Sequence, residues 1–201
     1  MDAFRYRRPA LPGGALFDAL PGDADPAQRA ETGARIAGLL VRGARTTADE
    51  AVIGRLVRLA DDHGLDLLAD LWQQAPPESL AGALWRLYLL RTWVHREPGR
   101  AAREYDTGRR YAPVHEVVAG VVEPPGPDEV CQLVDTVLRG VAVSDLAVTL
   151  ERAAAFARVV ATGRAHLPEE RPGSTRSAAR LITTAEQLEF AGRLERAGEL
   201  T

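Results

Sequence analysis

The chain has 201 residues, of which 46% are hydrophobic and 26% are charged, and its formal net charge is −3. The length indicates one domain or at most two small ones, with the composition of an ordinary globular protein. The slightly acidic balance gives no general attraction to nucleic acid or to an anionic membrane. No apolar stretch reaches membrane-spanning length, and the N-terminus lacks the apolar run of a signal peptide. We therefore expect a soluble cytoplasmic protein.

All 25 basic residues are arginine, which we attribute to the codon usage of a GC-rich bacterial genome. The single cysteine, Cys131, excludes an intrachain disulfide and a cysteine-based metal cluster. It lies beside the apolar stripe of a predicted helix, so we interpret it as a packing residue. The sequence contains no dinucleotide-binding, phosphate-binding or nucleophile motif, and its histidines lack zinc-binding spacing. We expect no cofactor and no metal.

The chain begins with an irregular arm over residues 1–25, which hold three prolines and three glycines among scattered apolar residues. Apolar periodicity and cap residues then predict about eight helices. The predicted ranges are 26–42, 47–63, 66–74, 80–96, 100–110, 127–139, 144–163 and 183–194.

Several helix boundaries have clear local signals. Asp25-Pro26 and Ser144-Asp145 provide a cap residue at the start of a helix. Thr183 and Glu186 form a capping-box pattern, so we expect residues 165–181 to be loose and the last helix to begin at Thr183. Residues 114–122 are rich in valine and could form a strand, but an isolated strand would have no partner, so we interpret them as buried helical turns.

The predicted helix 80–96 is apolar on nearly every side, with Leu84 and Leu87 on one half and Trp85, Leu89 and Trp93 on the other. Such a helix is usually buried and needs several neighbouring helices to cover it. We therefore predict an all-α, single-domain bundle of mostly antiparallel helices, because most connections are short. The expected parts are the arm 1–25, a bundle over 26–164, and a flexible connection with a C-terminal helix over 165–201.

Two arginines, Arg86 and Arg91, interrupt this apolar helix. A buried arginine needs a carboxylate or an anionic ligand, because an unpaired buried charge is costly. We favour a carboxylate from another helix, and an anionic small ligand in a bundle pocket is the alternative.

Residues 86–110 hold seven arginines and three acidic residues, with aromatic residues between them. Arginines with aromatics suit a protein partner or an anion, whereas the simpler interpretation is a solvated helix with internal pairs such as Arg100 with Glu104. The candidate ligand- or partner-binding residues are Arg86, Arg91, Trp93, Arg96, Arg100, Arg103, Tyr105 and His115.

These observations favour a non-enzymatic helical protein that acts through protein–protein interaction, with another protein or with itself as a homodimer. One alternative is a ligand-responsive transcriptional regulator with a helix-turn-helix in residues 27–75. Its expected recognition helix, 66–74, is acidic, which does not favour nucleic acid as a partner. The other alternative is an enzyme whose site combines scattered residues such as His115 and Glu116 with nearby arginines.

Overall fold

The computed structural model describes residues 26–43, 71–111, 124–138, 145–168 and 174–201. These ranges contain six helices and no strand, so the described part of the chain is all-α as predicted. The helices are α2 (Pro26–Arg42), α5 (Leu80–Arg96), α6 (Pro98–Tyr111), α7 (Pro127–Leu138), α8 (Leu146–His166) and α9 (Ser174–Ala197). The predicted helix 47–63, most of 66–74, the segment 114–122 and the arm 1–25 lie outside the described residues. The count of eight helices therefore stays a prediction.

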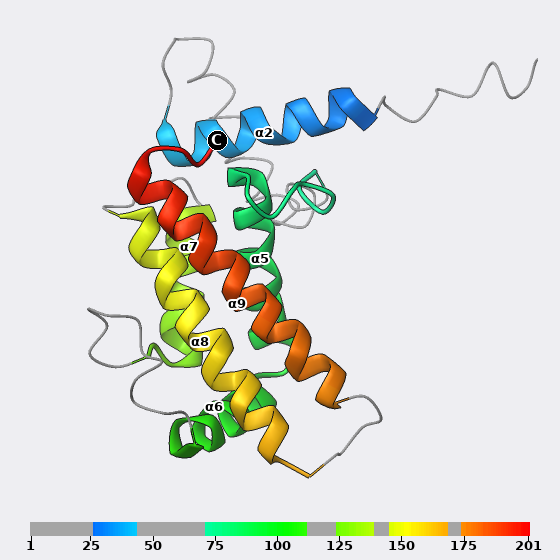
Figure 1. Ribbon diagram of the computed structural model, residues 1–201, viewed down its shortest axis with the longest axis vertical. Coiled ribbons are helices and arrows are strands. Elements are labelled where there is room, and N and C mark those ends of the chain that lie inside the picture. The colour runs from blue at the N-terminus through cyan, green and yellow to red at the C-terminus, as the bar shows by residue number, and fades with distance from the viewer. Residues whose placement is uncertain (1–25, 44–70, 112–123, 139–144, 169–173) are drawn as a thin grey trace, which may run out of the picture.

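Helices α8 and α9 form a long antiparallel pair, and α2 crosses one end of the bundle near the C-terminus (Figure 1). Helix α6 crosses α8 at the opposite end, while α5 and α7 lie behind the pair (Figure 1). Helix α5 packs against each of the other described helices. The apolar character of this helix thus predicted its central place correctly.

Local sequence signals fix several helix ends. Ser79 caps α5, because its hydroxyl accepts a hydrogen bond from the Gly82 amide at 3.1 Å. Asp145 caps α8 in the same way through the Val148 amide, at 3.0 Å. Helix α2 ends at Gly43, which has a φ of +78°, a conformation that favours glycine.

The prediction for the last helix was wrong at its start. Helix α9 begins at Ser174, so Thr183 lies in its interior and the expected capping box does not cap it. The hydroxyls of Thr183 and Thr184 donate to the carbonyls of Ala179 and Arg180, four residues earlier, as threonines inside a helix do. The helix extends because Ala178 and Ala185 are buried in the bundle. The described part of the expected helix 66–74 also differs, since residues 71–74 form turns.

The core is filled by large aliphatic and aromatic side chains from α5, α8 and α9, including Leu84, Leu87, Phe156 and Leu188, all fully buried. Helices α6 and α8 approach one another at backbone distance. A Cβ atom on Gly163 would lie 1.7 Å from the carbonyl oxygen of Glu104, so only glycine fits this crossing. Helix α6, predicted as a surface helix, therefore has one face pressed against α8.

Candidate functional site

The two arginines of α5 have different partners. Arg91 forms an ion pair with Asp135 of α7, and both side chains are partly exposed. This is the carboxylate from another helix that the sequence analysis favoured. Arg86 instead uses neutral acceptors: its Nε donates to Gln187 Oε1 of α9 at 2.6 Å, and its Nη1 donates to the Gly82 carbonyl at 2.7 Å.

Arg86 forms no ion pair within the part of the chain that the structure describes. Burial lowers the pKa of its guanidinium, and the nearby Glu78 carboxylate opposes that shift. The Glu78 side chain is exposed. Arg86 thus links α5 to α9 through hydrogen bonds, with a carboxylate close by but not in contact.

Arg100 belongs to a partly buried charge network that reaches residues of α8 and α9. Its Nε donates to Glu104 Oε1 at 2.7 Å, and its Nη1 donates to Glu97 Oε2 at 3.0 Å. The other Glu104 oxygen accepts from Arg164 Nε and Nη2, at 2.9 and 2.7 Å. Arg164 also donates to the Ser177 hydroxyl at 2.6 Å. The two positive and two negative charges of this network balance, and its contacts connect α6, α8 and α9. We call Glu104 and Arg164 the buried pair.

The aromatic candidates Trp93 and Tyr105 face the interior of the bundle. The Trp93 ring lies 6.4 Å from the Phe156 ring, and the Arg164 guanidinium lies 5.0 Å from the Trp93 centroid. Tyr105 is 5% exposed and its hydroxyl donates to the Pro124 carbonyl at 2.5 Å. Contacts within the bundle therefore explain the positions of both side chains, and no binding partner is needed to explain them.

The remaining candidates lie apart from this network. Arg103 and Arg96 are exposed, and His115 lies outside the described residues. Arg103 has an interaction partner within the chain. Arg96, at the end of α5, has no hydrogen bond or ion pair in the described structure. Among the candidate arginines, Arg96 thus differs from Arg86, Arg91, Arg100 and Arg103, each of which has a partner within the chain.

One face of α5 stays open to solvent. Trp85, Leu89, Thr92 and Arg96 are spaced i, i+4, i+7 and i+11, which places them along one side of the helix. We call these four residues the α5 strip. Leu89 is 44% exposed, Trp85 and Thr92 are half-buried and Arg96 is exposed. The Trp85 ring is held by stacking on Tyr88, with centroids 5.5 Å apart.

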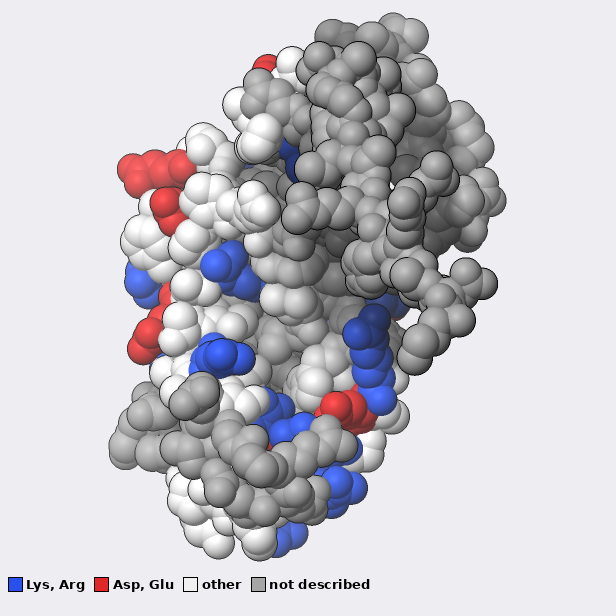
Figure 2. Space-filling model, turned by 90° about the vertical axis from the view of Figure 1, so that its right-hand side faces the viewer, with Lys and Arg blue, Asp and Glu red and all other residues white. Residues whose placement is uncertain are grey.

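The α5 strip combines an aromatic, an aliphatic and an unpaired cationic side chain on a helix that the whole bundle holds in place. Aromatic residues and arginine are enriched at protein interfaces and among the residues that contribute most to binding. Figure 2 shows the right-hand side of the molecule of Figure 1. On the described surface of this face, several arginines gather in the lower part around an acidic group, and others lie apart from them.

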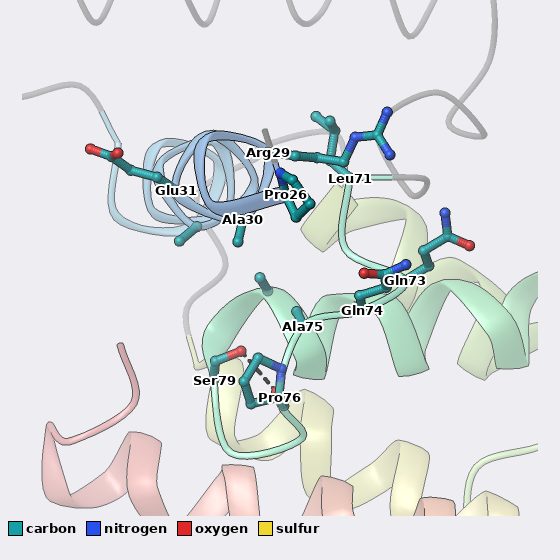
Figure 3. A pocket seen from close by; sticks show the side chains of 12 residues that line it. Pro26, Arg29, Ala30, Glu31, Leu71, Gln73, Gln74, Ala75, Pro76 and Ser79 are labelled. Atoms are coloured by element: carbon teal, nitrogen blue, oxygen red, sulfur yellow. Dashed lines mark hydrogen bonds between the residues drawn. The ribbon is translucent and has the colours of Figure 1, made fainter. Parts of the chain in front are cut away.

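A pocket of about 590 Å³ lies between the first half of α2 and residues 71–81 (Figure 3). Its lining is mostly small and apolar, with Arg29 and Gln73 at one end and Glu31 at the other (Figure 3). The Ser79 hydroxyl is already engaged as the α5 cap and as a donor to the Pro76 carbonyl at 2.8 Å. The size suits a small ligand, but no buried polar side chain among the described residues is directed into the pocket to orient one.

Sequence reasoning found the α5 arginines but not their partners. The Arg100–Glu104 pair was predicted from its i, i+4 spacing and is confirmed. Arg164, Asp135 and Gln187 were missed, because they come from distant parts of the chain and no local pattern marks them. The exposure of Leu89 was also hidden, since its sequence context is that of a core residue.

The chain matches no protein-family model, no curated protein and no solved structure at a significant level. Among the described residues, no group of three histidine, cysteine or acidic side chains is placed to hold a metal ion. No helix in the described ranges has both the length and the apolar character needed to cross a bilayer. Residues 44–70 of the expected helix-turn-helix, 27–75, lie outside the described residues, so the transcriptional-regulator alternative stays a prediction.

Proposed function

We propose that this protein acts by binding another protein through the α5 strip. The observation that carries the proposal is the exposure of Leu89, at 44%, in the middle of the most central helix of the bundle. Leu89 lies between Trp85 and Arg96 along the strip, and tryptophan and arginine are residue types enriched at protein interfaces.

The rigidity of the α5 strip supports this role. Helix α5 is capped by Ser79 and packs against each of the other described helices, so its exposed side is held in one conformation. A surface that is already ordered loses less conformational entropy on binding.

Phe190 of α9 offers a matched comparison, because it is also 44% exposed. The Arg193 guanidinium lies over its ring, 5.6 Å from the centroid, so part of the apolar surface already has a contact within the chain. A comparison of substitutions at Leu89 and Phe190 therefore distinguishes a partner-binding surface from ordinary exposure of an apolar side chain.

Native size-exclusion chromatography of extracts from the cells that make the protein tests the proposal. We expect the parent chain to elute in a complex larger than the monomer. The Leu89→Arg variant should elute as a monomer, while Phe190→Arg should stay in the complex. Elution of all three chains as monomers, or equal loss of the complex with both variants, would overturn the proposed function.

A further inference from the structure

The two halves of the α5 strip differ in character. The half toward the N-terminus of α5 holds Trp85 and Leu89, and the other half holds Thr92 and ends at the exposed Arg96. The Arg96 side chain has no hydrogen bond or ion pair within the described residues. It lies about two turns from Leu89, roughly 10.5 Å along the helix at the usual rise. We call these parts the apolar half and the cationic half of the strip.

The register between α5 and α9 shows which part of α9 lies beside each half. At the start of α5, the Leu80 amide donates to the carbonyl of Thr201, beyond the end of α9, at 2.8 Å. Further along α5, Arg86 contacts Gln187, which lies earlier in the chain than Thr201. Residue numbers therefore rise along α5 while they fall along α9, so the two helices run antiparallel.

Arg180 of α9 lies beside the cationic half. It precedes Gln187 by two helical turns, so both lie on the side of α9 that faces α5, and the antiparallel register sets it level with Trp93. A second contact agrees with this position. The Arg164 guanidinium lies 5.0 Å from the Trp93 centroid and donates to the hydroxyl of Ser177, about one turn before Arg180. The Arg180 side chain is exposed and forms no hydrogen bond or ion pair in the part of the chain that the structure describes.

The described acidic side chains near these two cations are engaged or lie elsewhere. Glu97 forms an ion pair with Arg100, at 3.0 Å. Glu78, before the N-terminus of α5, acts electrostatically on Arg86. Glu186 directly precedes the residue of α9 that contacts α5, so it is turned by about 100° away from that side of the helix. The cationic half therefore carries positive charge that no described carboxylate contacts.

We propose that the partner of the α5 strip is an acidic amphipathic helix of another protein, with apolar side chains against Trp85 and Leu89 and carboxylates against Arg96 and Arg180. This inference rests on the proposed function, because it names the chemistry of the partner at the same surface. The apolar contact supplies buried area, and the carboxylates fix the direction of the helix along the strip.

Helical spacing and charge both support this occupant. The strip is spaced i, i+4, i+7 and i+11, and a helix that packs along it meets it with side chains at the same intervals. An apolar residue and a carboxylate two turns apart on the partner then match Leu89 and Arg96. The strip itself contains no acidic residue, so a second copy presenting the same strip offers no carboxylate to Arg96.

Two synthetic peptides that differ only in charge test the inference. Each is a helix-forming peptide of about 18 residues with the same leucines, and it carries either glutamate or arginine two turns from them. Fluorescence anisotropy of the labelled peptides measures their binding to the purified full chain. The glutamate peptide should bind more tightly by roughly tenfold or more, and added salt should remove most of this difference, because it screens exposed charges.

Substitutions in the full chain locate the source of the preference. A double Arg96→Glu and Arg180→Glu variant should reverse it and bind the arginine peptide better. Arg110→Glu, at an exposed arginine outside the strip, should keep the preference of the parent. Binding of neither peptide, equal binding of both, or an unchanged preference in the double variant would overturn the acidic partner.

A photo-crosslinking amino acid at position 92, in the cells that make the protein, tests the occupant itself. Sequencing of the crosslinked segment by mass spectrometry should find a segment of another protein in which Asp and Glu outnumber Arg and Lys. A basic segment, a second copy of this chain, a nucleic acid or a lipid would contradict the inference. If the extract still contained a complex that Leu89→Arg disrupts, the proposed function would stand with a partner of different chemistry.

Discussion

The Glu104→Gln substitution removes the negative charge of the buried pair while keeping the size of the side chain. The Glu104 and Arg164 side chains are 4% and 7% exposed, so the charge left on Arg164 stays almost wholly out of water. Removing one partner of a buried ion pair costs about 3–5 kcal/mol of folding free energy. Glutamine still offers one oxygen to a guanidinium, so we expect the lower end of this range, about 3 kcal/mol.

Urea unfolding followed by circular dichroism and by tryptophan fluorescence measures this loss. The fluorescence signal is informative because the Arg164 guanidinium lies 5.0 Å from the Trp93 ring centroid. Glu151→Gln is the matched control, since its partner Arg196 on α9 is 51% exposed. An exposed pair contributes about 1 kcal/mol or less, so the control should be nearly as stable as the parent.

A double substitution, Glu104→Leu with Arg164→Met, tests the same reasoning from the other side. It removes both charges together, and buried ion pairs replaced by apolar side chains of similar volume often lose little stability. We expect the double variant to lie within about 1 kcal/mol of the parent, with a large coupling energy between the two sites. A cost for Glu104→Gln no larger than that of Glu151→Gln, or simple additivity of the two changes, would refute the account of the buried pair.

Three further predictions concern the core. Burial raises the pKa of the Cys131 thiol to about 11, so the native protein should resist thiol reagents at pH 8 until urea unfolds it, and rapid labelling of the native protein would contradict this. The free energy of unfolding should fall from pH 9 to 11, because the thiol of the unfolded chain ionises first, and a Cys131→Val variant should lose that pH dependence. Gly163→Ala should lower the free energy of unfolding by more than about 3 kcal/mol, because its Cβ would meet backbone atoms of α6. Gly38→Ala, with no atom within 4 Å of the added Cβ, should stabilise α2 by about 0.5 kcal/mol in thermal unfolding. Equal effects of the two substitutions would show that α6 and α8 do not cross at backbone contact. Leu200→Ala, at a side chain 4% exposed, should cost about 2–3 kcal/mol in urea unfolding, and Leu89→Ala well under half of that; equal costs would contradict the burial difference.

The predicted helices were most accurate where the signals are local. Asp145 caps α8, Gly43 ends α2 and the apolar run of 80–96 defines α5, and each signal lies within a few residues of the boundary it sets. The start of α9 was wrong because a capping-box pattern at Thr183 competes with burial of residues such as Ala178 against the bundle. Tertiary packing decides whether the helix begins at Thr183 or at Ser174, and a local sequence pattern carries no information about that packing.

The candidate site divides in the same way. The Arg100–Glu104 pair depends on helical spacing alone and was predictable. The contact between Arg91 and Asp135 depends on how α5 packs against α7, so the sequence indicated the need for a carboxylate but not its position. Tyr105 was grouped with surface residues although it is buried, because a polar, arginine-rich sequence conceals which face of α6 meets α8.

The central claim is that the α5 strip is where this protein meets its partner. A photo-crosslinking amino acid placed at position 89, in the cells that make the protein, tests it most directly, with the same group at position 190 as the control of equal exposure. We predict a discrete crosslinked product from position 89 and none from position 190. No product from position 89, or the same products from both positions, would contradict the claim.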